Sequence, residues 1–385
     1  MKDAHYMRRA VAEAKKALGR THPNPAVGAV IVKGGRIVAT GYHAKAGTPH
    51  AEAVALARAG TRAEGATLYS TLEPCNHQGR TPPCTEAIIA AKIARVVYAS
   101  ADPNPLVNGK GHRRLLEAGV EVVPSVLREE ADLLNRPFFK SVTAGLPWVT
   151  LKAGATLDGK IAAPTGRPRW ITSEASRARA HELRNQVDAI LVGAGTVSAD
   201  DPLLTTRLPG GRNPARIVLD SQLKSSPRAK VFDVSKARTI VATLLSEAHP
   251  RARSLAKRGV EVWTLPERKG QVALLPLLDR LARAGLLHLL VEGGAQVHAS
   301  FLSQRLADEL VLFVAPKVFG DAGLTWSGAL GPRAPTVELT QLSAELVGGD
   351  VLITGLFPPR VPRRRAAQRP TARSVEPSKR LATVK

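Results

Sequence analysis

Three short stretches between residues 50 and 84 carry the side chains that most constrain how this chain can fold. They are His-Ala-Glu at 50–52, Glu-Pro-Cys at 73–75, and Cys84. His50, Cys75 and Cys84 provide one imidazole and two thiols, a ligand set suited to a catalytic zinc that leaves its fourth position to water. The chain has only two cysteines, and both lie here. These stretches therefore predict a zinc site, and the fold must bring them together.

The chemistry expected of such a site is hydrolytic deamination. Zinc lowers the pKa of a bound water to about 7, so that hydroxide is available at neutral pH. Glu52, two residues beyond the imidazole, would carry the water's proton to the departing ammonia. The His-x-Glu and Pro-Cys pieces match the zinc nucleobase-deaminase signature, although that signature ends in Cys-x-x-Cys. Here eight residues separate the two thiols.

Simpler interpretations of these residues remain open from the sequence alone. An isolated histidine is usually hydrogen-bonded in the surface or core, and intracellular cysteines are usually inert buried thiols. A disulfide between Cys75 and Cys84 is a further alternative. The conjunction favours the metal site, because His-x-Glu opens an alanine-rich helix, Pro-Cys follows an apolar strand and the second Cys starts another helix.

Length and composition predict more than this one site. A chain of 385 residues is long enough for two domains, each with its own core, and 44% of its residues are hydrophobic, as in globular proteins. No apolar run approaches the length that spans a bilayer, and the first residues lack the apolar core of a signal peptide. We therefore expect a cytoplasmic protein with no membrane partner.

The net charge of +23 is concentrated in part at the C-terminus. Residues 359–385 hold seven Arg, two Lys and one Glu, which gives +8 and leaves +15 for the rest. This Pro- and Arg-rich tail has no hydrophobic period, so we expect it to be disordered. It lacks the aromatic residues and folded reader of a nucleic-acid-binding segment, so no nucleic-acid partner is expected. The remaining excess charge suits phosphorylated ligands.

The first 145 residues predict an α/β domain with three layers, because helical and strand patterns alternate. Gly34-Gly35 indicates a hairpin, and Asn24 lies in a Pro-rich loop where it could contact a base edge or simply form a turn. We expect helices at 2–18, 50–59, 85–91, 111–118 and 127–135, and strands at 26–32, 36–39, 66–70, 95–100 and 120–123.

Residues 146–358 predict a second α/β domain after a boundary near Gly145. Two glycine turns follow strands there, at 193–196 and 292–295, and either could approach a cofactor phosphate closely or merely connect a strand to a helix. We expect helices at 173–186, 272–284 and 295–302, and strands at 148–152, 189–192, 216–219, 239–242, 260–264, 287–291 and 309–314.

A run of motifs resembles the bifunctional riboflavin-biosynthesis deaminase/reductase family. The resemblance covers residues 1 to 357 in order, which makes it far more specific than any single motif. Its motifs are Thr-His-Pro-Asn-Pro at 21–25, the zinc-type stretches at 50–52, 71–75 and 79–84, Asp-Pro-Asn-Pro at 102–105, Leu-Asp-Gly-Lys at 157–160, Trp-Ile-Thr at 170–172, Asp-Asp-Pro at 200–202 and Val-Glu-Gly-Gly at 291–294.

The resemblance implies a cytidine-deaminase-like α/β/α N-terminal domain and a dihydrofolate-reductase-like C-terminal domain. The first would remove the 2-amino group of a phosphorylated diaminopyrimidinone riboside, and the second would use NADPH to reduce the ribosyl group to ribityl. A homo-oligomer is also expected. The motifs alone do not distinguish NADPH from NADH, although basic residues nearby favour NADPH.

Individual site residues follow by matching positions to the family. Zinc falls on His50, Cys75 and Cys84, with Glu52 as the proton shuttle. The expected cofactor-binding residues are Gly154, Trp170, Thr196, Asp200, Gly293, Gly294, Ala295, Gln296 and Val297, and the expected substrate-binding residues are Asn24, Lys152, Arg184, Leu204, Arg207 and Glu292.

One position departs from the family pattern. Pro168 stands before Trp170 where a small hydroxyl residue is expected to contact substrate, and proline lacks that donor. A deaminase with a degenerate reductase half therefore remains an alternative. A polynucleotide deaminase and a non-enzymatic RNA-binding protein are two others, both suggested by the basic charge.

Overall fold

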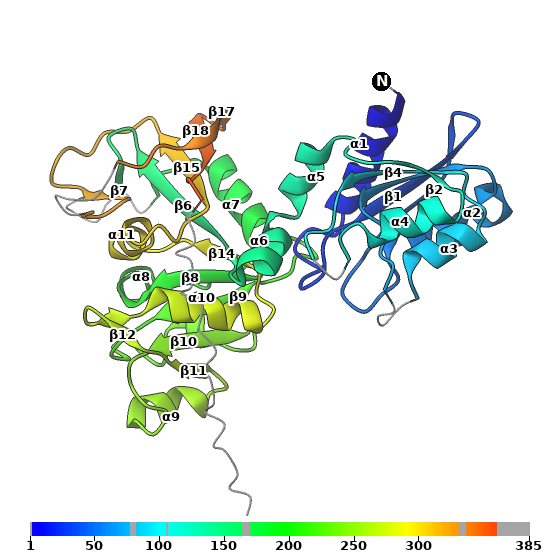
Figure 1. Cartoon of the computed structure of the whole chain (residues 1–385). Helices are drawn as coiled ribbons and strands as arrows, with labels where there is room; N and C mark the ends of the chain where they lie inside the picture. Colours follow the sequence, from blue (N-terminus) through cyan, green and yellow to red (C-terminus); the bar gives the residue numbers. More distant parts are fainter. Residues whose placement is uncertain (1, 78–81, 105–106, 164–169, 331–335, 360–385) are drawn as a thin grey trace, which may run out of the picture.

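The computed structural model describes residues 2–77, 82–104, 107–163, 170–330 and 336–359. They form two α/β bodies, and two short helices, α5 (Arg128–Leu134) and α6 (Arg136–Ala144), lie in the connection between them (Figure 1). Residue Pro168, residues 78–81 of the zinc-type motif and the tail from 360 onward lie outside the described residues.

A five-stranded sheet forms the N-terminal body, with strand order β2-β1-β3-β4-β5. Its first strands are antiparallel because Gly34 and Gly35 turn the chain directly back with positive φ angles. Strands β3, β4 and β5 then run parallel, since a helix connects each to the next. The strands are β1 (Gly28–Lys33), β2 (Arg36–Tyr42), β3 (Thr67–Leu72), β4 (Arg95–Ser100) and β5 (Glu121–Val123).

Helices cover both faces of this sheet, which confirms the expected three layers. Helices α1 (Lys2–Lys15) and α5 pack on one face, where Met7 and Ala131 are fully buried. On the other face Ala55, Ile88 and Leu115 are fully buried, and they belong to α2 (Ala51–Ala59), α3 (Cys84–Ala90) and α4 (Lys110–Glu117). A short 3-10 turn, η1 (Gly60–Ala63), follows α2.

The C-terminal body is built on a nine-stranded sheet with strand order β11-β10-β9-β8-β14-β6-β15-β18-β17. Strands β11 to β15 in this order are parallel, and β18 and β17 add an antiparallel edge. The strands are β6 (Trp148–Thr156), β8 (Ala189–Gly193), β9 (Ala215–Leu219), β10 (Thr239–Thr243), β11 (Glu261–Thr264), β14 (His288–Val291), β15 (Glu309–Ala315), β17 (Thr340–Val347) and β18 (Asp350–Leu356).

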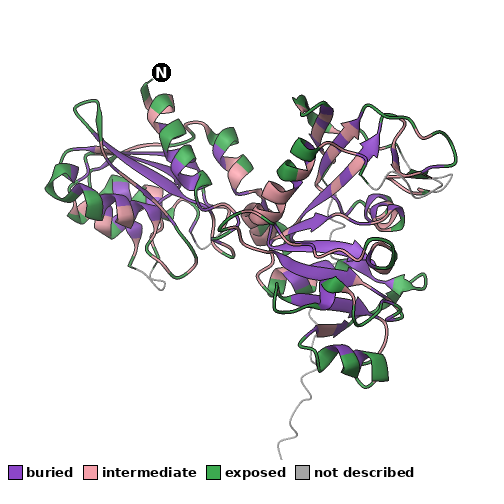
Figure 2. Ribbon diagram, turned by 180° about the vertical axis from the view of Figure 1, so that it is seen from behind, coloured by how far each residue is buried: buried purple, intermediate pink, exposed green. Residues whose placement is uncertain are grey.

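Helices cover the two faces of the second sheet, so its central strands are buried on both sides (Figure 2). Apolar runs such as Ile190-Leu191-Val192 suit this double burial. Helices α10 (Leu274–Arg283) and α11 (Ala295–Ser303) lie on one face, and α7 (Glu174–Gln186) and α9 (Pro250–Ala256) on the other. Smaller elements are α8 (Ala194–Asp200), η2 (Lys230–Phe232) and two minor pairs: β7 (Lys160–Ala162) with β16 (Leu324–Thr325), and β12 (Glu267–Arg268) with β13 (Gln271–Val272).

Several elements differ from the sequence expectation. The strand expected to end at residue 152 continues to Thr156, because β15 pairs with it up to Ala315. Helices α6, α8 and α9, the hairpin β17–β18 and the two minor strand pairs were not predicted. Within the described parts of the chain, no helix is long and apolar enough to cross a membrane.

Candidate functional sites

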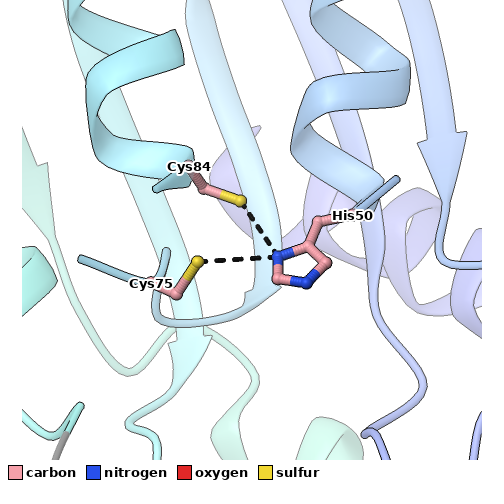
Figure 3. Close-up of side chains that lie close together, drawn as sticks. All are labelled: His50, Cys75 and Cys84. Carbon is pink, nitrogen blue, oxygen red and sulfur yellow. Dashed lines mark hydrogen bonds between the residues drawn. The ribbon is translucent and has the colours of Figure 1, made fainter. Parts of the chain in front are cut away.

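The predicted zinc ligands meet at one point of the N-terminal body (Figure 3). His50 is the residue before α2, Cys75 follows β3 and Cys84 is the first residue of α3. The His50 Nδ1 atom lies 3.2 Å from the Cys84 Sγ and 3.5 Å from the Cys75 Sγ. Among the described residues, this is the only His/Cys/Asp/Glu group of at least three whose ligand atoms all lie within 4.8 Å of one another.

The spacing and ionisation of these three groups fit a tetrahedral zinc. Zinc bonds of about 2.3 Å to sulfur and about 2.0 Å to nitrogen place such ligands roughly 3.5 Å apart. The hydrogen bond from the Cys84 thiol, together with the contact to His50, lowers the pKa of Cys75 to about 4. Cys75 is therefore a thiolate at neutral pH, which is the form that binds metals.

Glu52 lies beside the metal-ligand cluster in the first turn of α2. Its side chain is buried, its Oε2 accepts from the Cys84 thiol at 3.7 Å, and its Oε1 accepts from the Ser70 hydroxyl at 3.1 Å. Burial raises the pKa of Glu52, and the neighbouring Cys75 raises it further. Both effects favour the protonated carboxyl group, which is the form that can deliver a proton to a reacting group.

Asn24 faces the same cluster from the loop between α1 and β1. Its Nδ2 atom is 3.1 Å from the His43 Nε2, and the His43 ring lies edge-on to that of His50 with centroids 5.5 Å apart. The other ring nitrogen of His43 is 3.1 Å from the Pro49 carbonyl oxygen. His43 was not predicted as a site residue, because an isolated histidine carries no local signal of a role.

Glu73 and α4 hold the loop that carries Cys75. The buried Glu73 carboxylate accepts hydrogen bonds of 3.1 Å from the amides of Gly109 and His112, at the start of α4. The helix comes so close that a Cβ on Gly111 would lie 1.9 Å from the Pro74 carbonyl oxygen. Only glycine fits at this position, so α4 fixes the backbone beside the metal ligand.

In the C-terminal body, the predicted reductase residues gather along one edge of the sheet. Strands β8, β14 and β6 are parallel neighbours, so their carboxyl ends meet at this edge, where ligands of open α/β sheets commonly bind. Lys152 lies within β6, while Glu292 and Gly193 come at the ends of β14 and β8.

A buried ionic network occupies this edge. Glu292 accepts two hydrogen bonds of 2.8 Å from the Arg184 guanidinium, and the Lys152 Nζ lies 3.8 Å from the same carboxylate. The Glu292 side chain is 7% exposed. Burial alone would raise the pKa of Glu292, but Arg184 and Lys152 together lower it to about 2. Burial lowers the pKa of Lys152.

The predicted cofactor loop is tightly packed at its glycines. A Cβ on Gly293 would lie 2.8 Å from the backbone of Val192, and one on Gly193 would lie 2.9 Å from the Val297 side chain. Gly294 has a φ of +73° and lies against the Thr196 hydroxyl. Because glycine has no side chain, the strand-to-helix turn at the start of α11 carries none at Gly293 and Gly294. Turns of this kind bind phosphates.

The remaining predicted residues lie in different settings. Trp170 is 53% exposed and lies under the Arg177 guanidinium at 5.0 Å. Leu204 is buried in the core, so only its backbone could contact a ligand. The others are Gly154 in β6, Asp200 at the end of α8, Arg207 in the loop before β9, and Ala295 and Gln296 at the start of α11.

Comparison with known proteins covers both bodies. Residues 1–100 match the model of the cytidine and deoxycytidylate deaminase zinc-binding region, and residues 147–353 match that of the RibD C-terminal domain. The riboflavin biosynthesis protein RibD of Aquifex aeolicus is 48% identical over 354 residues, which are 91% of this chain and 97% of that protein. The Escherichia coli protein of the same name is 42% identical over 368 residues, 92% and 99% of the two chains.

Two solved structures are similar over the same span. A diaminohydroxyphosphoribosylaminopyrimidine deaminase/5-amino-6-(5-phosphoribosylamino)uracil reductase from Thermotoga maritima is 40% identical with a TM-score of 0.82, covering 92% of this chain and 99% of that one. RibD of Acinetobacter baumannii is 34% identical with a TM-score of 0.82, covering 93% and 99%.

Fold, sites and comparisons together define a two-domain enzyme that joins a zinc-type deaminase domain to a reductase domain. The chain belongs to the RibD family, the bifunctional deaminase/reductases of riboflavin biosynthesis. It is therefore both a hydrolase and an oxidoreductase, as the sequence resemblance implied.

Proposed function

We propose that the N-terminal domain deaminates 2,5-diamino-6-(5-phosphoribosylamino)pyrimidin-4(3H)-one and that the C-terminal domain reduces the product, 5-amino-6-(5-phosphoribosylamino)uracil, with NADPH. The observation that carries this proposal is the convergence of two thiols, an imidazole and the Glu52 carboxyl in a chain of the RibD family. The Thermotoga maritima relative is named for these two activities.

In the deaminase domain, His50, Cys75 and Cys84 would hold the zinc. When bound, zinc supplies a water acidic enough to lose its proton near neutral pH. Glu52 accepts a proton and delivers it to the leaving amine, a role that its raised pKa suits. Asn24, held beside His43, donates a hydrogen bond to the pyrimidine and orients its amino-bearing carbon toward Glu52.

In the reductase domain, the turn from Gly293 to Val297 would bind a cofactor phosphate through its backbone amides. Thr196, Gly154, Trp170 and Asp200 would supply further contacts to the cofactor. Lys152, Arg184 and Glu292 bind and orient the ribosyl group, and Arg207 suits the sugar phosphate because a guanidinium can bind it through two donors. NADPH would supply the hydride, and the protein juxtaposes the reacting carbons.

Mass spectrometry of the products tests both activities at once. The zinc-loaded protein receives the diaminopyrimidinone ribosyl phosphate with and without NADPH. We expect deamination without cofactor, and deamination plus a gain of two hydrogens with it. Deamination without reduction in both tubes would leave a monofunctional deaminase and point to Pro168. A lack of reaction in either tube would contradict the proposal.

Variants of the deaminase site separate metal binding from proton transfer. Cys75→Ser removes a ligand, so zinc content and deamination should both be lost while reduction of pre-deaminated substrate continues. Glu52→Gln should keep the zinc and lower the deamination rate by about 10²–10⁴-fold. Glu64→Gln is a matched control, because that carboxylate is exposed and pairs with Lys92. Stoichiometric zinc and full activity in Cys75→Ser would overturn the ligand assignment.

Three broader features belong to the same proposal. The domains divide between residues 145 and 146, where Gly145 caps the end of α6 with a φ of +68°. A reducing compartment, the cytoplasm, keeps Cys75 and Cys84 able to bind metal. A homo-oligomer would cover the exposed Leu342 and Leu346 on edge strand β17, and light scattering of the purified protein would measure it.

A further inference from the structure

A buried hydrogen bond between two side chains joins the two domains directly. His22 lies in the loop between α1 and β1, and its Nδ1 is 2.6 Å from the Asp188 Oδ2, just before β8 of the reductase domain. The side chains are only 11% and 6% exposed. His22 lines a cavity of about 140 Å³ at the junction, together with Gln186 and His288 of the second domain.

Asp188 is a fixed anchor on the reductase side. Its Oδ2 also accepts hydrogen bonds of 2.9 Å from the backbone amides of Leu287 and His288, where β14 begins. The Arg212 guanidinium lies 3.5 Å from the other carboxylate oxygen. Although burial alone would raise the pKa of Asp188, the hydrogen bond from His22 helps to keep it below its ordinary value. The carboxylate is therefore ionised, and its hydrogen bonds hold it in one orientation.

The other end of the same loop is held by the connection between the domains. Asn135, between α5 and α6, accepts from the Ala26 amide at 2.8 Å and donates to the Ala26 carbonyl at 3.0 Å. Near the start of the loop, Gly19 approaches the second domain so closely that a Cβ there would lie 2.4 Å from the Gln186 carbonyl oxygen. The loop is thus fixed by residues outside the deaminase sheet at both ends.

This loop carries Asn24, the proposed substrate contact of the deaminase. The backbone N–H of Asn24 donates to the Thr21 carbonyl at 2.9 Å, so Asn24 and His22 lie within one tight turn. The Asn24 side chain in turn reaches His43 beside the metal ligands. A displacement of His22 would therefore move Asn24 while the metal ligands and Glu52 stay in place.

We propose that His22 is a positioning residue, through which Asp188 of the reductase domain holds Asn24 in place to bind the deaminase substrate. Deaminase substrate affinity then depends on an intact junction with the second domain. This inference rests on the proposed deaminase function and on the proposed role of Asn24. The contact between His22 and Asp188 then serves substrate binding by the deaminase as well as joining the two domains.

Kinetics of the full-length, zinc-loaded protein test the inference. His22→Leu removes the donor and keeps the bulk, and His22→Ala is a second variant of different volume. The KM for deamination should rise at least about tenfold, because a hydrogen bond to a charged group is lost. The deaminase kcat should change less than twofold, and zinc content and the kinetics of reducing pre-deaminated substrate should stay unchanged.

Two further variants make the result specific. His22→Asn should restore most of the affinity, since its amide nitrogen takes the place of the imidazole Nδ1. Lys140→Met is the matched control: it breaks the part-buried pair of Lys140 and Asp308, 2.5 Å apart, which links α6 to the second domain at the same junction. Its deaminase KM should stay within twofold of the wild type.

The outcomes separate this inference from the proposed function. An unchanged KM in His22→Leu, with a raised KM in Asn24→Ala, would overturn the role of His22 and leave the deaminase function standing. A KM raised equally by Lys140→Met would show a general effect of loosening the domains, which also contradicts the inference. Loss of deamination in the wild-type protein itself would instead count against the proposed function.

Discussion

Removing the charge of Glu292 should destabilise the reductase domain strongly. Glu292→Gln keeps the size of the side chain but leaves Arg184 and Lys152 close together without their carboxylate. These two side chains are 14% and 18% exposed, so water compensates little. Breaking a buried ion pair by removing one partner typically costs several kcal/mol, because the remaining charge stays buried.

The magnitude follows from the pKa of Glu292, which lies at about 2 in the folded protein instead of the ordinary 4.5. Each pKa unit corresponds to about 1.4 kcal/mol, so the folded state gains about 3 kcal/mol from the ionised form. Because the folded pKa is the lower one, this stabilisation is present above about pH 4.5 and is lost as the pH falls toward 2. For a domain of this size, it corresponds to a Tm shift of roughly 6–12 °C.

Tryptophan fluorescence isolates the domain concerned. All four tryptophans lie in the second domain, at positions 148, 170, 263 and 326. Thermal unfolding without ligands at pH 7 should show a lower Tm by fluorescence for Glu292→Gln, and the difference from wild type should shrink below pH 4. Glu182→Gln, on the same helix as Arg184, is the control, since its pair with Arg179 is exposed and contributes about 1 kcal/mol at most. A Tm within 2 °C of wild type would refute the reasoning.

Three other variants test separate parts of the structure. Gly111→Ala forces a Cβ against the Pro74 carbonyl oxygen, so zinc affinity should fall at least about tenfold in a chelator competition. Arg95 lowers the pKa of Asp3 to about 2, so its stabilisation is present above pH 3.8 and lost toward pH 2. Asp3→Asn should therefore cost about 1 kcal/mol at pH 7 by circular dichroism and nothing near pH 2. Phe301→Ala empties a fully buried site and should cost about 3–5 kcal/mol in urea unfolding.

The sequence predicted the helices and strands whose pattern is long or bounded by clear signals. Strand β4 has the expected bounds, and α7 begins one residue after its predicted start because Ser173 caps it through a hydrogen bond to the Ser176 amide. Helix α6 was missed because its Arg-Pro-Phe-Phe start suggests a connection. Helix α8 was missed because Gly-Ala-Gly is typical of a turn. Both are short, and packing against the body of the protein stabilises them.

The candidate metal centre could be predicted because its ligands lie close together in the sequence. Its three ligands lie within 35 residues, each next to a strand end or helix start that the pattern itself predicts. The pair of His22 and Asp188 had no such signal, since the two residues are 166 positions apart and neither belongs to a metal-binding pattern. Contacts of this range depend on how two separately folded sheets meet, which hydrophobic periodicity does not encode.

The difference between contacts within one sheet and contacts between two sheets explains why the deaminase site, rather than the reductase site, depends on the domain junction. In the reductase domain, Lys152 on β6, Gly193 on β8 and Glu292 directly after β14 belong to one continuous sheet, so hydrogen bonds between these strands fix their relative positions. The deaminase sheet fixes its metal ligands in the same way, but it does not fix the loop that carries Asn24, which precedes its first strand. That loop is held by Asp188 and Asn135 instead. A deaminase domain separated from its partner should therefore keep zinc more readily than it keeps substrate affinity.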